Sequence, residues 1–180
     1  MEVNIVFKQG GSKTIYDYNY NKKKNYRKYV DVCRVLKYVT DPDKRKSINI
    51  CGKFNLYSEM ASNQADEMRK LLHCFEKKNG YKIRHFCFNV ESISSKVLRN
   101  PKFETALRKT LKYFKDYPAV YALHEDAQNK HIHVVVCSVS VTGKTLDLSD
   151  KYLAKFAEHF EKKLDVFYPK HAKVKIILYT

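Results

Sequence analysis

The feature that most constrains the fold of this chain is a pair of short apolar runs separated by a polar stretch. Residues 119–123 (Ala-Val-Tyr-Ala-Leu) follow Pro118, and residues 132–136 (Ile-His-Val-Val-Val) are mostly β-branched, so both runs predict strands. Residues 125–130 between them are polar and fit a hairpin loop. An antiparallel hairpin is therefore expected in the second half of the chain.

This hairpin brings three of the seven histidines together. His124 ends the first strand and His131 begins the second, so pairing places their Cβ atoms about 5 Å apart. His133 shares a face with His131, because side chains alternate along a strand. Converging neutral imidazoles without a fourth strong ligand nearby predict a metal ion with open coordination positions. The alternative is a pair of structural strand histidines beside an unrelated third.

The ligand set limits the choice of ion. Nitrogen ligands alone favour zinc or manganese over magnesium. A phosphate substrate, however, can complete the shell of a harder ion with its oxygens. A divalent ion is therefore expected, with Mg²⁺ or Mn²⁺ as the first expectation in function and Zn²⁺ as the second.

Charge indicates the class of ligand. Lys and Arg number 35 against 19 Asp and Glu, and a net charge of +16 suits a polyanion such as nucleic acid. Residues 16–28 interleave tyrosines with cations, a composition that fits either base stacking or a solvated, mobile loop over residues 9–28. No apolar stretch is long enough for a membrane span and no signal peptide is recognisable, so a cytoplasmic chain without membrane insertion is expected.

The remaining periodicity predicts the fold class. Strands are expected at residues 3–8, 47–51, 81–90 and 174–179, and helices at 29–40, 58–78, 103–114 and 153–164. This mixed order with one direct hairpin predicts a single α+β domain over residues 1–180, a two-layer sandwich in which helices cover a central, mainly antiparallel sheet of about five strands. The histidine face is expected to be the uncovered side of the sheet.

Two motifs resemble those of the HUH single-strand endonucleases, and more closely those of the P-class conjugative relaxases. The first is like the family's tyrosine motif and the second like its metal motif: Leu36-Lys37-Tyr38-Val39-Thr40-Asp41 and His124-x-Asp126-x-x-Asn129-x-His131-x-His133. The similarity spans most of residues 30–165, and the tyrosine precedes the histidines as in relaxases. The resemblance implies a metal-dependent nickase that cuts a transfer-origin strand in conjugative mobilisation of a plasmid or integrative element, forming a 5′-phosphotyrosyl adduct.

The resemblance also implies roles for individual residues. Tyr38 would be the nucleophile, and His124, His131 and His133 would hold the ion. Arg34 lies four residues before Tyr38, on the same face of the expected helix, where its charge would favour the phenoxide.

The sequence offers further candidates beside these. Asp126 would orient a ligand imidazole or accept the tyrosine proton, or else cap its own loop. Tyr26 and Tyr29 are the alternative nucleophiles. Two positions depart from the family pattern: Cys137 stands where Asn is frequent, and Asn89 where Ser is frequent.

The implied partners are single-stranded DNA at a transfer origin, accessory mobilisation proteins and a coupling protein. The absence of any extension for helicase or primase functions is typical of a minimal or fragmentary relaxase. Two other functions stay open: a replication initiator or transposase with the same chemistry, and a module that binds single-stranded DNA without cutting it.

Overall fold

The computed structural model describes residues 5–7, 28–45, 47–89, 94–125, 130–147, 155–156, 158–160, 162–163 and 175–179, with backbone only for 5–7, 88–89 and 175–179. Its strands are β1 (Ile5–Phe7), β2 (Cys51–Phe54), β3 (Ile83–Asn89), β4 (Ala119–Glu125), β5 (Lys130–Cys137) and β6 (Lys175–Tyr179). Its helices are α1 (Tyr29–Thr40), η1 (Pro42–Lys44), α2 (Ala61–Cys74), α3 (Ser95–Leu98), α4 (Pro101–Leu111) and η2 (Lys112–Phe114). Most of the tyrosine-rich segment 9–28 lies outside the described residues.

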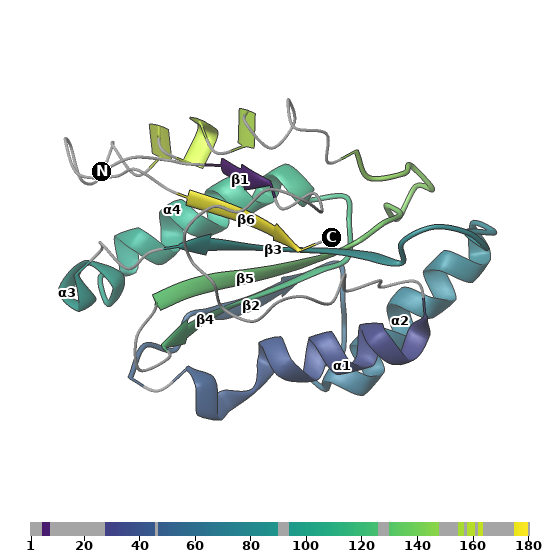
Figure 1. Cartoon of the computed structure of the whole chain (residues 1–180), viewed down its shortest axis with the longest axis horizontal. Helices are drawn as coiled ribbons and strands as arrows, with labels where there is room; N and C mark the ends of the chain where they lie inside the picture. The colour runs from purple at the N-terminus through teal and green to yellow at the C-terminus, as the bar shows by residue number, and fades with distance from the viewer. Residues whose placement is uncertain are drawn as a thin grey trace.

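All of these strands form one sheet in the order β1-β6-β3-β5-β4-β2 (Figure 1). From β6 to β2 every neighbouring pair is antiparallel, and β1 joins the edge parallel to β6. The predicted α+β class and mainly antiparallel sheet are confirmed, with six strands where about five were expected. No helix of the described residues is long and apolar enough to cross a membrane.

The predicted histidine hairpin is confirmed in its register. His124 pairs with His131, and Ala122 pairs with His133. On the other side of β5, Cys87 of β3 pairs with His133. The histidine-bearing strand β5 is therefore central, with neighbours on both sides.

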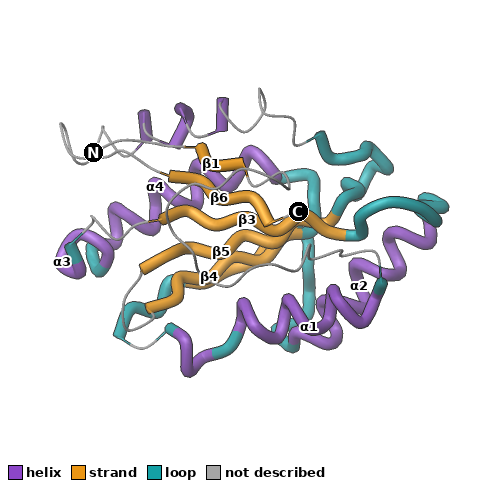
Figure 2. Tube along the Cα trace, in the orientation of Figure 1, coloured by secondary structure: helices purple, strands orange, loops and turns teal. Residues whose placement is uncertain are grey.

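Helices cover both faces of the sheet, as Figure 2 shows for α1 and α2 on one side and α4 on the other. One core joins α4 and the residues around Phe156 to the strand face of Ile132, Val134 and Val136. The second core joins α1 and α2 to the opposite face, which carries Val135 and the histidines.

The expectation that the histidine face is uncovered is therefore wrong. The reason lies in α1, whose stripe of Val32, Leu36 and Val39 is buried. A stripe of this kind needs an apolar surface, and Val120, Ala122 and Val135 provide it on the histidine face of the sheet.

Local departures from the sequence prediction have simple causes. The strand expected at 47–51 begins only at Cys51, because β2 pairs with β4 from Cys51 onward. Within β2, Gly52 faces its strand partner Tyr121 so closely that a Cβ would lie 2.6 Å from the Cζ atom of that buried ring. Any larger residue would displace the tyrosine. Helix α2, expected to extend to residue 78, ends at Cys74, and Phe75 just beyond it is 41% exposed.

Candidate metal and tyrosine site

Strands β4 and β5 bring the three predicted histidines into one cluster, which we call the histidine triad. His124, His131 and His133 each offer one ring nitrogen, and these atoms lie within 4.8 Å of one another. The Nε2 atoms of His131 and His133 are 2.9 Å apart. His124 and His133 are buried while His131 is partly exposed, so the cluster has one open side.

The protonation of His124 follows from its hydrogen bond. Its Nε2 lies 2.9 Å from the carbonyl oxygen of Val39. Because a carbonyl can only accept, Nε2 carries the proton and Nδ1 holds the lone pair that can bind an ion. The Val39 carbonyl is one of the last four of α1, which lack a partner within the helix. The bond therefore fixes the triad to the end of α1.

The donor set fits a divalent ion. Nitrogens that share a tetrahedral ion stand about 3.3 Å apart when each bond is about 2.0 Å long. The triad nitrogens all lie within 4.8 Å of one another, and the pair from His131 and His133 is 2.9 Å apart. The hydrogen bond from His124 to a backbone carbonyl is the usual way in which a ligand histidine is oriented. Three nitrogen ligands leave coordination positions for oxygens of a substrate.

Tyr38 lies directly against the triad. It is the half-buried third-last residue of α1, and its ring centroid is 5.1 Å from that of His124 and 5.3 Å from that of His133. Helix α1 ends two residues later, where the Asp41 carboxylate accepts a hydrogen bond from the Asp43 backbone in front of η1. The following turn places the Lys44 ammonium 5.0 Å from the centre of the Tyr38 ring.

The other predicted residues lie elsewhere. The Arg34 side chain is 78% exposed, and its guanidinium is 4.0 Å from the Asp31 carboxylate. The described cation over Tyr38 is thus Lys44, for which the sequence carried no signal. Asp126 and Tyr26 lie outside the described residues. Tyr29 begins α1, about 14 Å from Tyr38 along the helix axis at 1.5 Å per residue.

Tyr29 also has the less favourable surroundings for ionisation. A hydrogen bond with Cys33 raises the pKa of its phenol, and partial burial adds to this. The Arg69 guanidinium over its ring lowers the same pKa by a smaller amount. Tyr29 therefore forms phenoxide less readily than an unperturbed tyrosine.

Two further residues, which lie beside the triad, had no role in the sequence prediction. His85 Nε2 lies 2.8 Å from His133 Nδ1, and Cys87 Sγ lies 2.6 Å from the same nitrogen. Side chains alternate along a strand, so both project from the same face of β3. Their meeting with His133 depends on the pairing of β3 with β5, which a single sequence does not reveal.

The two positions that depart from the family pattern lie in different surroundings. Cys137 is buried in the second core opposite Ile83, and burial raises the pKa of its thiol to about 11. Cys137 lies four residues along β5 from His133, about 13 Å away. The departure from the family's Asn at this position therefore affects the core and not the triad. Asn89 pairs with His131 through the backbone, while its side chain is not described.

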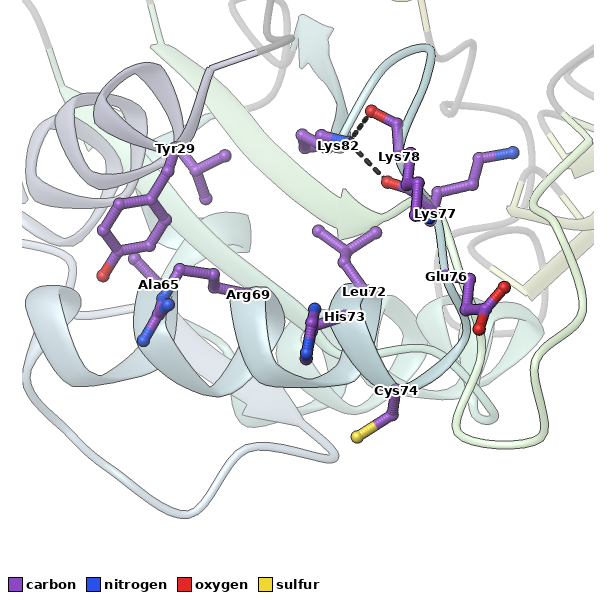
Figure 3. Close-up of a pocket in the computed structure, with 11 residues that line it drawn as sticks. Tyr29, Ala65, Arg69, Leu72, His73, Cys74, Glu76, Lys77, Lys78 and Lys82 are labelled. Carbon is purple, nitrogen blue, oxygen red and sulfur yellow. Dashed lines mark hydrogen bonds between the residues drawn. The ribbon is translucent and has the colours of Figure 1, made fainter.

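A separate pocket of about 550 Å³ lies at the far end of α1 (Figure 3). Its walls come from Tyr29 of α1, from the last turns of α2 and from the connection to β3, where the Lys82 ammonium donates to the carbonyl of Lys78 over 2.9 Å and to that of Lys77. Arg69, Lys77, Lys78 and Lys82 give it a basic lining. None of the triad lines this pocket.

Comparison with known families finds a match that covers most of the chain. Residues 38–165 match the family model described as "Relaxase: MobA/VirD2-like, nuclease domain". The match begins at Tyr38 and includes the triad, His85 and Cys87. A search of curated proteins finds no significant match.

Proposed function

Because the chain belongs to the family of MobA/VirD2-like relaxases and carries their nuclease domain, we propose that it nicks one strand of single-stranded DNA through Tyr38. The observation that carries this proposal is the contact of the Tyr38 ring with the rings of His124 and His133. A phosphate bound at the triad would lie within reach of the phenol oxygen. Residues 1–180 would act as a single nuclease domain.

The reaction is a transesterification. The Tyr38 oxygen forms a bond to the scissile phosphorus and loses its proton, while the bond from phosphorus to the 3′ oxygen breaks and that oxygen takes up a proton. The products are a 5′-phosphotyrosyl adduct and a free 3′ hydroxyl. The adduct keeps the energy of the phosphodiester bond, so the strand can be rejoined by attack of a 3′ hydroxyl.

Each side chain has a separate task in this scheme. The triad would hold a divalent ion, Mg²⁺ or Mn²⁺ first and Zn²⁺ second, which when bound polarises the phosphate and offsets charge on its oxygens. Lys44 holds positive charge beside the phenol and so favours phenoxide. Asp126 is proposed as the proton acceptor or as an orienting partner of a triad imidazole. Arg34, exposed beside Asp31, is proposed to act more weakly.

Single-stranded DNA is proposed to bind through its phosphates to the positively charged surface of the protein, whose net charge is +16. The Arg99 guanidinium donates to the Ser47 hydroxyl and the Lys130 ammonium to the Ser95 hydroxyl, so both cations lie near the loop end of the β4–β5 hairpin. In the cell the substrate would be a transfer origin in conjugative mobilisation, reached together with accessory mobilisation proteins and a coupling protein.

The test is covalent capture on an oligonucleotide from the intergenic region beside the gene. The wild type should form a DNA adduct that survives denaturing electrophoresis, and mass spectrometry should locate it on Tyr38. Tyr38→Phe should still bind DNA and divalent ion, since only a hydroxyl is lost, yet form no adduct. Tyr29→Phe, a matched change on the same helix, should cut like the wild type.

Three results would count against the proposal. An adduct on Tyr26 or Tyr29, or continued cutting by Tyr38→Phe, would move the nucleophile elsewhere. Tight DNA binding by the wild type with no cutting of any origin sequence would favour the non-cleaving binding module instead.

A further inference from the structure

We propose that the chain has a second metal site, which contains sulfur and shares His133 with the triad. Its ligands are His85, Cys87 and His133, called the sulfur site below. Their ligand atoms lie within 4.8 Å of one another, and all three side chains are buried. The site takes a thiophilic divalent ion of the zinc class, because a thiolate ligand selects zinc over magnesium or manganese.

The geometry of His133 separates the two sites. Its Nδ1 faces His85 Nε2 at 2.8 Å and Cys87 Sγ at 2.6 Å, whereas its Nε2 faces His131 Nε2 at 2.9 Å. Each ring nitrogen is thus directed to a different group of ligands. The ring stands between the two sites.

The distances allow an ion to enter after a small adjustment. Donors around tetrahedral zinc are about 3.3 Å apart for two nitrogens and about 3.6 Å for nitrogen and sulfur. The two pairs that include His133 would have to separate by about 1 Å or less, and the ligand atoms of His85 and Cys87 already lie within 4.8 Å of each other. Binding displaces the thiol proton of Cys87 to solvent, and the ion compensates the buried thiolate charge.

Competition between the sites follows from the imidazole itself. A neutral imidazole has one lone pair, so His133 cannot offer both nitrogens at once. With Nδ1 bound in the sulfur site, Nε2 carries the proton and no longer serves the triad. Zinc in the sulfur site should therefore weaken binding of Mn²⁺ or Mg²⁺ at the triad. This competition rests on the proposed function of the triad, while the existence of the sulfur site does not.

Cobalt(II) titration of tag-free, metal-free protein tests for the site, because a cobalt–thiolate bond gives a charge-transfer band in the near ultraviolet. The wild type should show the band. Cys87→Ser should lose it, whereas Cys74→Ser, a control at an exposed cysteine, should keep it. His131→Ala, which removes a triad ligand only, should also keep it. Absence of the band from the wild type, or its survival in Cys87→Ser, would overturn the site.

A second variant covers the case in which Cys87→Ser does not fold, as judged by circular dichroism. His85→Gln keeps the thiol but removes one ligand, so its cobalt affinity should fall at least about tenfold. An unchanged affinity would overturn the proposed ligand set.

Electron paramagnetic resonance of Mn²⁺ tests the competition between the sulfur site and the triad. Zn²⁺ should displace bound Mn²⁺ from wild-type protein at a concentration at least about tenfold lower than from Cys87→Ser, because only the wild type offers the sulfur site. Equal displacement in both would overturn the competition. Neither failure affects adduct formation at Tyr38, so failure of this inference is distinguishable from failure of the proposed nicking.

Discussion

At the scale of single residues, two cations near Tyr38 differ in where their side chains lie. Tyr38 is half-buried against imidazole rings, and the Lys44 ammonium lies 5.0 Å from the centre of the Tyr38 ring. Arg34, one helical turn away, points to solvent and to Asp31. The cation described beside the tyrosine therefore comes from the turn after α1 and not from the helix itself.

The first prediction compares these two cations. Lys44→Gln should slow cleavage about two- to fivefold and move the pH–rate profile to higher pH, because loss of a nearby positive charge makes phenoxide harder to form. Arg34→Gln, a matched neutralisation, should change both less. Single-turnover cleavage measured from pH 6 to pH 10 decides between them. A larger effect of Arg34→Gln would restore the role that the sequence predicts for it.

The second prediction concerns Cys137 and alkaline stability. Burial raises the pKa of this thiol from 9.0 to about 11, so the unfolded chain loses its proton first. The stabilisation from the neutral thiol is complete below about pH 9 and is lost as the pH rises toward about 11, a change of about 2–3 kcal/mol.

Denaturant unfolding at pH 8, 9, 10 and 11 measures this. Cys137→Ala should be less stable at pH 8, because a buried side chain is shortened, but should lose less stability between pH 9 and pH 11 than the wild type. Tyr121, whose pKa burial raises to about 12, adds the same loss above pH 10 to both proteins. Parallel curves would show that Cys137 does not titrate in this window.

At the scale of elements, the essential junction is the one between α1 and the β4–β5 hairpin. The hairpin carries the triad, α1 carries Tyr38, and the hydrogen bond from His124 to the Val39 carbonyl joins them. In the proposed function His124 would have two tasks, since its Nε2 donates to the helix end and its Nδ1 would bind the ion. His131, at the open side, has no bond of this kind to α1 among the described contacts.

This difference gives the third prediction. In the presence of a chelator, His124→Ala should lower the free energy of unfolding by about 1–3 kcal/mol, because it leaves a buried carbonyl without its donor. His131→Ala should lower it by less than about 1 kcal/mol, since that side chain is partly exposed. Both variants should lose the divalent ion. Chemical denaturation and calorimetry of ion binding separate the two effects, and equal destabilisation would contradict the anchoring role of His124.

At the scale of the whole molecule, the excess of positive charge sets the mode of DNA binding. A net charge of +16 on 180 residues attracts the phosphate backbone whatever its sequence. In the proposed function an ion at the triad would act on a single phosphate, while the charged surface contacts many. Affinity and cutting should therefore be separable.

The fourth prediction uses this separation. The affinity for a labelled single-stranded oligonucleotide should fall by about tenfold or more between 50 and 200 mM salt, as counterions compete for the phosphates. The double variant His131→Ala with His133→Ala should show nearly the same affinity and salt slope, yet bind no ion at the triad. Fluorescence anisotropy measures both. A flat salt response would show that charge does not dominate binding.

The sequence by itself determined the local features of this protein. Alternation along residues 130–137 and the polar loop before them fixed the hairpin and set His124 opposite His131, because a strand has a side-chain period of two. Spacing of Val32, Leu36 and Val39 fixed the buried stripe of α1. These features depend only on residues close together in the chain.

Only the tertiary structure decided how the elements meet. The pairing of β3 with β5 carried His85 and Cys87 to His133, and the packing of α1 on the histidine face brought Tyr38 to the triad and made that face covered. Lys44 reached Tyr38 through a turn with no signal of its own. Strand order and helix placement arise from contacts between distant segments, whose partners follow from the burial of apolar surface over the whole chain and not from any local pattern.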